Sequence, residues 1–171
     1  MRRCGRGFSL IELLIVVAII LIIAAIAIPD LLKSRTAANQ ASAVGSLRMI
    51  VTSEVAYAST YTVGYSSTLL QLDGNAVPSN VNSAGLIDSV LASGSKSNYN
   101  FYYVPCVTPA VPNNGTLAPG PCGTNPITIY QVSANPSGGL GLGNYYFTDS
   151  SAVIRQKSSG PAGPADTPLG G

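Results

Sequence analysis

Few residues of this 171-residue chain have the types that covalent catalysis needs. There is no histidine, so a Ser-His-Asp or Cys-His site would lack its base. The acids are few and scattered along the chain: Glu12, Asp30, Glu54, Asp73, Asp88, Asp149 and Asp166. We therefore expect no enzymatic activity and no cofactor. The carboxylate that needs an explanation is Glu12, because an apolar run from Leu13 to Ile28 follows it directly.

Two of the three cysteines, Cys106 and Cys122, lie sixteen positions apart in a stretch rich in proline and glycine. If this part of the chain is exported, a Cys106–Cys122 disulfide is expected. Closing a loop of that size stabilises a domain by roughly 3 kcal/mol in the chain-entropy model. The alternative of two free thiols stays open. Without histidine or a Cys-x-x-Cys pair, a zinc site has almost no ligands, and we expect no metal.

The element that positions Glu12 is an apolar segment from Phe8 to Ile28. A helix of that length spans roughly 30 Å, which is the hydrocarbon thickness of a bilayer. A lone acid in such a segment costs on the order of 2.5–3.5 kcal/mol on insertion scales. Glu12 therefore needs a partner or a purpose.

Two ordinary interpretations of this N-terminus leave Glu12 without a role. The first is a secretory signal peptide cleaved after Ala27, and the second is an uncleaved membrane anchor. The apolar run is longer than the roughly 7–15 residues of a signal peptide, and helical spacing continues after Pro29. Both observations disfavour the signal peptide.

The residues Arg6-Gly7-Phe8-Ser9-Leu10-Ile11-Glu12, together with the apolar run, resemble the type IV pilin and type II secretion pseudopilin family. That family combines a basic leader ending in glycine, a phenylalanine, and a glutamate before an apolar helix. The resemblance implies that prepilin peptidase cleaves between Gly7 and Phe8 and that Phe8 is then N-methylated. It also implies that Glu12 meets the Phe8 amine of a neighbouring subunit and sets the register of assembly.

Basic residues favour one orientation of this segment in the membrane. Three arginines precede it and two bases follow, so the leader is expected to stay in the cytoplasm: Arg2, Arg3, Arg6, then Lys33 and Arg35. The precursor is then a single-pass protein of the bacterial inner membrane with a periplasmic head, destined for a pilus at the cell surface.

The resemblance implies an α+β pilin fold, in which one long kinked helix carries a small antiparallel sheet on its outer half. We expect a kink at Pro29, which lacks an amide donor. The expected parts are a leader at 1–7, a transmembrane and filament-core helix half at 8–28, an amphipathic half at 29–59, a globular head at 60–157 and a flexible tail at 158–171.

Helical spacing beyond Pro29 predicts the face of the helix that packs. One apolar stripe is formed by Val44, Leu47, Val51, Val55 and Ala58. Arg48 and Glu54 are interpreted as solvated or intersubunit charges. Aromatic residues at 57, 61 and 65 are expected to pack where helix and head meet.

Alternation predicts the strands of the head at 99–104, 127–134, and 144–148 paired with 152–156 through a turn at 149–151. Short helices are expected at 67–72 and 83–92. The stretch 105–126 is expected to be a surface loop. It contains a glycosylation-type sequon at Asn114, which is a weak signal.

The leading functional prediction is a structural pilin that polymerises with copies of itself into a type IV pilus filament. Its other expected partners are prepilin peptidase, an inner-membrane assembly platform and membrane lipid before assembly. The alternatives are a type II secretion pseudopilin and a minor pilin for adhesion or DNA uptake. Nucleic acid is not expected, because the residues after the leader carry six bases against seven acids. Calcium at Asp149, as in some pseudopilins, is disfavoured by low ligand density.

Overall fold

A computed structural model describes residues 8–74, 78–105, 126–138 and 143–170. The chain divides into two compact units, residues 1–37 and 38–171. One helix, α1, runs from Leu10 to Tyr61 and so contributes to both units. It contains Pro29 without interruption, which agrees with the prediction that the helical pattern continues past this residue. Gly7, Cys106, Cys122 and the Asn114 sequon lie outside the described residues.

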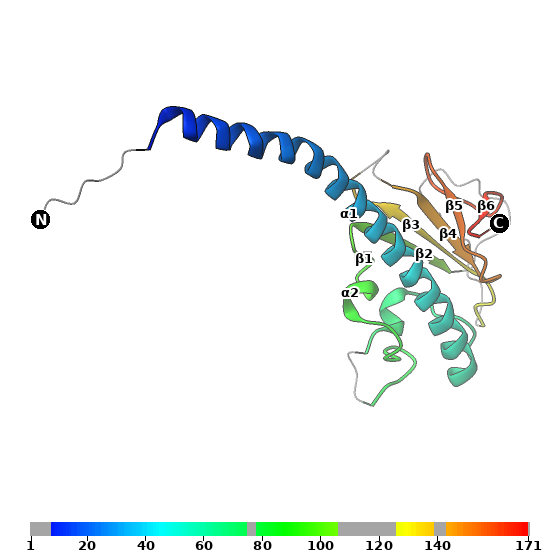
Figure 1. Cartoon of the computed structure of the whole chain (residues 1–171). Helices are drawn as coiled ribbons and strands as arrows, with labels where there is room; N and C mark the ends of the chain where they lie inside the picture. The colour runs from blue at the N-terminus through cyan, green and yellow to red at the C-terminus, as the bar shows by residue number, and fades with distance from the viewer. Residues whose placement is uncertain (1–7, 75–77, 106–125, 139–142, 171) are drawn as a thin grey trace, which may run out of the picture. The chain divides into compact units, whose positions relative to one another are not determined.

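The second unit contains a six-stranded antiparallel sheet with strand order β1-β2-β3-β4-β5-β6 (Figure 1). The strands are β1 Ser95–Lys96, β2 Tyr99–Pro105, β3 Tyr130–Pro136, β4 Tyr145–Asp149, β5 Arg155–Lys157 and β6 Thr167–Pro168. The short helices are the 3-10 helix η1 Leu69–Leu72 and the α-helix α2 Ser89–Ala92. The α+β fold class with an antiparallel head is therefore confirmed.

The core of this unit lies between the sheet and the part of α1 from Ala38 onward, which crosses the sheet in Figure 1. Strand register brings Phe101 opposite Ala134, and Ala134 opposite Tyr146, so these side chains share one face. The residues of α1 that join this core are Ala43, Leu47, Ile50 and Tyr57. Aromatic and β-branched residues fit a pleated surface buried on one side, which explains why these segments form strands.

The stripe predicted for α1 is wrong by about one residue of helix rotation. Val55 is exposed, and the buried face instead runs through Ala43, Leu47, Ile50, Glu54 and Tyr57. Polar side chains on that face satisfy their hydrogen-bonding groups. The Ser53 hydroxyl donates to the Leu86 carbonyl at 3.2 Å, and the Tyr57 hydroxyl donates to the Val81 carbonyl at 2.7 Å. The positions of apolar residues alone therefore do not identify the face of α1 that packs against the sheet.

The hairpin between β4 and β5 follows the prediction. The Asp149 carbonyl accepts the Ala152 N–H at 2.9 Å, and its carboxylate accepts the Ser151 N–H at 2.8 Å. Strand β5 begins later than expected, at Arg155, and pairs with β4 through Phe147 opposite Arg155. The helix predicted at 83–92 is reduced to α2, because residues 84–87 hydrogen-bond instead to the backbone of residues 71–73.

The flexible tail predicted for 158–171 is also wrong. Strand β6 pairs with β5, and Ala162 is buried against Tyr145 and Phe147 on the sheet face opposite the main core. Asp166 fastens this segment, since its carboxylate accepts the Gly163 N–H at 2.8 Å and its carbonyl accepts from Arg155 at 3.1 Å. Covering the apolar surface of Phe147 offsets the entropy that ordering a Gly/Pro-rich segment costs.

Candidate functional site

The start of α1 places Glu12 in a helix cap. The Ser9 N–H donates to Glu12 Oε2 at 2.9 Å. The Ser9 carbonyl accepts the N–H groups of Glu12 at 3.1 Å and Leu13 at 3.3 Å. A serine followed three residues later by glutamate is the sequence of a capping box, and an acid in the first turn also complements the helix dipole. Glu12 is therefore bonded within its own chain.

Phe8 lies outside the helix, so it does not share a helical face with Glu12. Helix α1 begins at Leu10, and the Phe8 side chain is 73% exposed. The Ser9 amide, which sequence reasoning overlooked, is the group that approaches Glu12. The Ser-x-x-Glu spacing is the signal that would have identified it.

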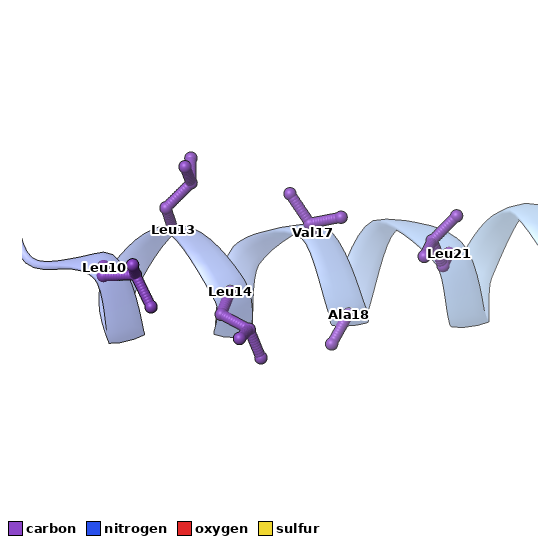
Figure 2. Close-up of a pocket in the computed structure, with 6 residues that line it drawn as sticks. All are labelled: Leu10, Leu13, Leu14, Val17, Ala18 and Leu21. Atoms are coloured by element: carbon purple, nitrogen blue, oxygen red, sulfur yellow. The ribbon is translucent and has the colours of Figure 1, made fainter.

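The apolar side chains of the first unit are exposed around the whole circumference of α1. Six of them line a shallow groove of about 400 Å³: Leu10, Leu13, Leu14, Val17, Ala18 and Leu21. Figure 2 shows them along one stretch of the helix, with Leu13 and Val17 on one side and Leu14 and Ala18 on the other. At about 100° per residue, Glu12 lies on the opposite side from this groove. The apolar groove and the Glu12 carboxylate therefore lie on opposite faces of α1.

Among the described residues, α1 is the one helix that has the length and composition to cross a membrane. At Pro29 the missing N–H leaves the Ala25 carbonyl without its usual helical donor. A kink there stays a prediction. Asp30 and Lys33 approach to 3.6 Å on the helix surface, and both are well exposed, so their pairing contributes little.

A second polar cluster surrounds Glu54, and here the sequence-based expectation of a solvated charge is wrong. Glu54 is fully buried. Its Oε2 accepts the Ser66 N–H at 2.9 Å, and its Oε1 accepts from the Ser66 hydroxyl at 2.6 Å. The Tyr103 hydroxyl donates to the Ser66 carbonyl at 2.8 Å. Burial raises the pKa of Glu54, although the bonds from Ser66 act in the opposite direction.

The tyrosines predicted to pack at the junction of helix and head do so. Tyr57 and Tyr61 lie with ring centroids 5.0 Å apart, and Tyr65 meets Tyr130 edge-on at 4.8 Å. Tyr130 also stacks with Tyr103, with the ring centroids 5.8 Å apart. Burial, followed by the nearby Glu54 charge, raises the pKa of the Tyr103 and Tyr130 hydroxyls. Glu54 lies three residues before Tyr57, so the two share a helical face. This spacing is the sequence signal that could have indicated the burial of Glu54.

Among the described residues, no group of three or more His, Cys, Asp or Glu side chains lies close enough to hold a metal ion. The Asp149 carboxylate is engaged with the Ser151 N–H of its own turn.

Residues 2–28 match the family model for the prokaryotic N-terminal methylation motif. Over 53 residues the chain is 48% identical to the type IV major pilin protein PilA of Myxococcus xanthus, covering 31% of this chain and 24% of that protein. Over 82 residues it is 40% identical to the type IV wide pilus major component PilA4 of Thermus thermophilus, covering 46% of this chain and 62% of that protein.

The methylation motif and the two pilin relatives support the type IV pilin family for this chain. The chain spans about a quarter of the length of the first relative and about three fifths of the length of the second. No solved structure matches it. The apolar part of α1 fits a membrane-anchored precursor.

Proposed function

We propose that this pilin is cleaved by prepilin peptidase between Gly7 and Phe8, is N-methylated on Phe8, and polymerises with copies of itself into a type IV pilus filament. The observation that carries the proposal is the apolar surface of α1, which is exposed on all sides. Glu12 lies in the first turn of this helix, where its carboxylate accepts the Ser9 N–H. Lipid can cover that surface before assembly, and only neighbouring helices can cover it in a filament outside the cell.

Glu12 has a role in each of the two states. In the single chain the Ser9 N–H holds its carboxylate. In the filament the positively charged Phe8 amine of a neighbouring subunit pairs with it, and the scarcity of water keeps that attraction weakly screened. A subunit inserted at another height would leave the carboxylate unpaired among apolar side chains, which is costly. The pair therefore favours one axial register.

Two substitutions at Glu12 separate the helix cap from the charge. Glu12→Ala removes both, whereas Glu12→Gln keeps an oxygen that accepts the Ser9 N–H and loses the charge. We expect both variants to insert in membranes as the wild type does and to yield few filaments by electron microscopy. Normal filament yield from Glu12→Gln would contradict the charge-pairing role.

Processing has its own test. Mass spectrometry of the mature N-terminus is expected to find N-methylated Phe8 as the first residue. A Gly7→Ala precursor should retain the leader. An uncleaved wild-type chain, or cleavage after Ala27, would contradict the proposed processing.

The printed names of both relatives refer to pili, which supports a pilus over a type II secretion pseudopilus. Electron microscopy of cells lacking this protein discriminates the alternatives. Loss of surface fibres is expected for a major pilin, and unchanged fibres would leave the pseudopilin or the minor pilin for adhesion or DNA uptake. The proposed orientation places the leader in the cytoplasm, the head in the periplasm of the inner-membrane precursor, and the assembly platform beside it.

A further inference from the structure

The buried carboxylate of Glu54 connects α1 to the segment that leaves it. Residues 62–68 follow the end of α1, and Ser66 within them gives both its N–H and its hydroxyl to Glu54. Ser66 is itself fully buried and is bound from the other side by Tyr103 of β2. Three parts of the head therefore meet at one carboxylate.

Other contacts also fix this segment: the Ser67 N–H donates to Gln71 Oε1 at 2.7 Å, and the Tyr65 ring meets the Tyr130 ring edge-on. The Tyr65 N–H donates to the Ile127 carbonyl at 2.8 Å. Gly64, at φ +84°, passes so close to Ile127 that a Cβ would meet its carbonyl oxygen at 2.3 Å. The path of the segment therefore combines these contacts with one close backbone approach, which needs glycine, and with the bonds between Glu54 and Ser66.

No cation offsets the charge of Glu54 within the described ranges, where the ion pairs are Asp30–Lys33, Asp88–Lys96 and Lys157–Asp166. The titratable groups that face Glu54 are phenols: Tyr57 of α1, Tyr103 of β2 and Tyr130 of β3. The pKa of each hydroxyl is raised, first by burial, so all three stay neutral near neutral pH. Two hydrogen bonds from Ser66, with a smaller contribution from the Tyr103 hydroxyl, therefore act against the cost of burying a carboxylate.

The hydrogen bonds also accommodate a protonated Glu54. A proton on Oε1 can be donated to the Ser66 hydroxyl oxygen, and that hydroxyl donates to the Thr68 carbonyl, which lies 3.1 Å away. The Ser66 N–H continues to donate to Oε2. Protonation thus removes the buried charge and requires only the reversal of one bond.

We propose that Glu54, Ser66 and Tyr103 form a proton-linked latch that holds residues 62–68 against α1 and β2, tightest when Glu54 is neutral and loosened when it ionises. Because the folded pKa of Glu54 is raised, the folded head binds this proton more tightly than the unfolded chain does. The contribution of the proton is complete below the ordinary glutamate pKa, and it is lost as the pH rises through the raised folded value.

The first test is a titration, which the sequence makes simple because Glu12 and Glu54 are the only glutamates. The full chain in detergent micelles is labelled with ¹³C at the glutamate carboxyl carbons. We expect the signal that Glu54→Gln removes to titrate above about 4.3, the ordinary value for glutamate. Ser66→Ala should move that midpoint higher, because it deletes one bond to the charged form. A Glu54 signal that titrates at or below about 4.3 would overturn the latch.

The second test is hydrogen exchange of residues 62–68 between about pH 4, below the ordinary glutamate pKa, and about pH 8, corrected for the intrinsic pH dependence of exchange. Wild-type protection should fall with rising pH, by up to about tenfold for each unit of pKa shift. Glu54→Gln should abolish this dependence, whereas Asp88→Asn, at a surface acid, should preserve it. Wild-type protection that is constant with pH, or a decrease that persists in Glu54→Gln, would refute the proposal.

Discussion

The two glutamates of this chain both lie on α1, and each accepts a hydrogen bond from a backbone N–H just outside the helix. Glu12 accepts from Ser9 at the helix start, and Glu54 accepts from Ser66 beyond the helix end. The first is exposed and the second is enclosed. The same chemical group therefore caps the start of α1 in one place and anchors the segment that follows α1 in the other.

The Tyr103 hydroxyl offers a direct measure of the Glu54 cluster. Tyr103→Phe removes the donor to the buried Ser66 carbonyl, 2.8 Å away. We expect this to lower the free energy of unfolding of the head by about 1–3 kcal/mol, the cost of an unsatisfied buried group. Denaturant titration of the head measures it.

The neighbouring residue gives the matched control. Tyr102 is 46% exposed, so Tyr102→Phe is expected to change the unfolding free energy by less than about 0.5 kcal/mol. Equal effects from the two variants would show that the Ser66 carbonyl finds another donor.

At the scale of elements, the short helix α2 depends on one residue at its start. The Asp88 carboxylate accepts the Leu91 N–H at 2.9 Å and the Lys96 ammonium at 2.8 Å. The Lys96 bond, then the Leu91 bond, lowers the pKa of Asp88. The stability that Asp88 contributes is thus present above its unfolded pKa and lost as the pH falls through the lower folded value.

Asp88→Ala should therefore destabilise the head at neutral pH by about 0.5–2 kcal/mol, the usual range for loss of an N-cap. The difference from wild type should shrink below about pH 4. Asp88→Asn keeps an oxygen for the Leu91 N–H and should cost less at neutral pH. Unfolding curves from pH 3 to pH 7 provide the comparison, and a difference that is constant across that range would contradict the pH argument.

Strong local patterns allowed the main elements to be predicted from sequence. The long apolar and alanine-rich stretch gave α1, and alternating aromatic residues gave β2, β3 and β4. The packed face of α1 was missed because Ser53 and Glu54 lie on it, and their partners Leu86 and Ser66 are distant in sequence. The cap at Ser9 was readable from spacing, whereas the burial of Glu54 depended on tertiary contacts.

The C-terminal segment was missed for a related reason. A Gly/Pro-rich composition predicts disorder. The segment is ordered by an apolar surface on β4, which the composition of the segment does not indicate. Ala162 covers Phe147, and β6 borders the sheet. Pro168 in this two-residue edge strand also limits further strand pairing at that edge.

Phe147→Ala tests this arrangement. The side chain is fully buried, so its loss should cost about 3–5 kcal/mol of unfolding free energy and expose the C-terminal segment to proteases. Val153→Ala, at a partly exposed position in the same hairpin, should cost far less and leave the segment protected. A stable, protease-resistant Phe147→Ala protein would show that the segment is held without the second core.

At the scale of the whole molecule, the two units satisfy their apolar residues by different means. Residues 38–171 enclose a core between sheet and helix, complete with a second small core under the C-terminal segment. The described residues of 1–37 bury almost none of their apolar surface within the chain. The hydrophobic effect therefore stabilises the head within one chain, whereas α1 up to Ala37 requires lipid or other copies.

This division predicts different behaviour for the two parts in solution. A fragment beginning at Ala38 should stay folded and monomeric without detergent, and its core should unfold at a temperature close to that of the head in the full chain. The full mature chain, transferred out of detergent, should associate, because an apolar groove and the surface around it remain uncovered. Light scattering and thermal unfolding of both proteins measure this.

Leu14→Ser and Val17→Ser together should weaken association of the full chain and leave its unfolding temperature unchanged, since neither residue belongs to the head. If the fragment associates as strongly as the full chain does, the assembly surface lies on the head instead.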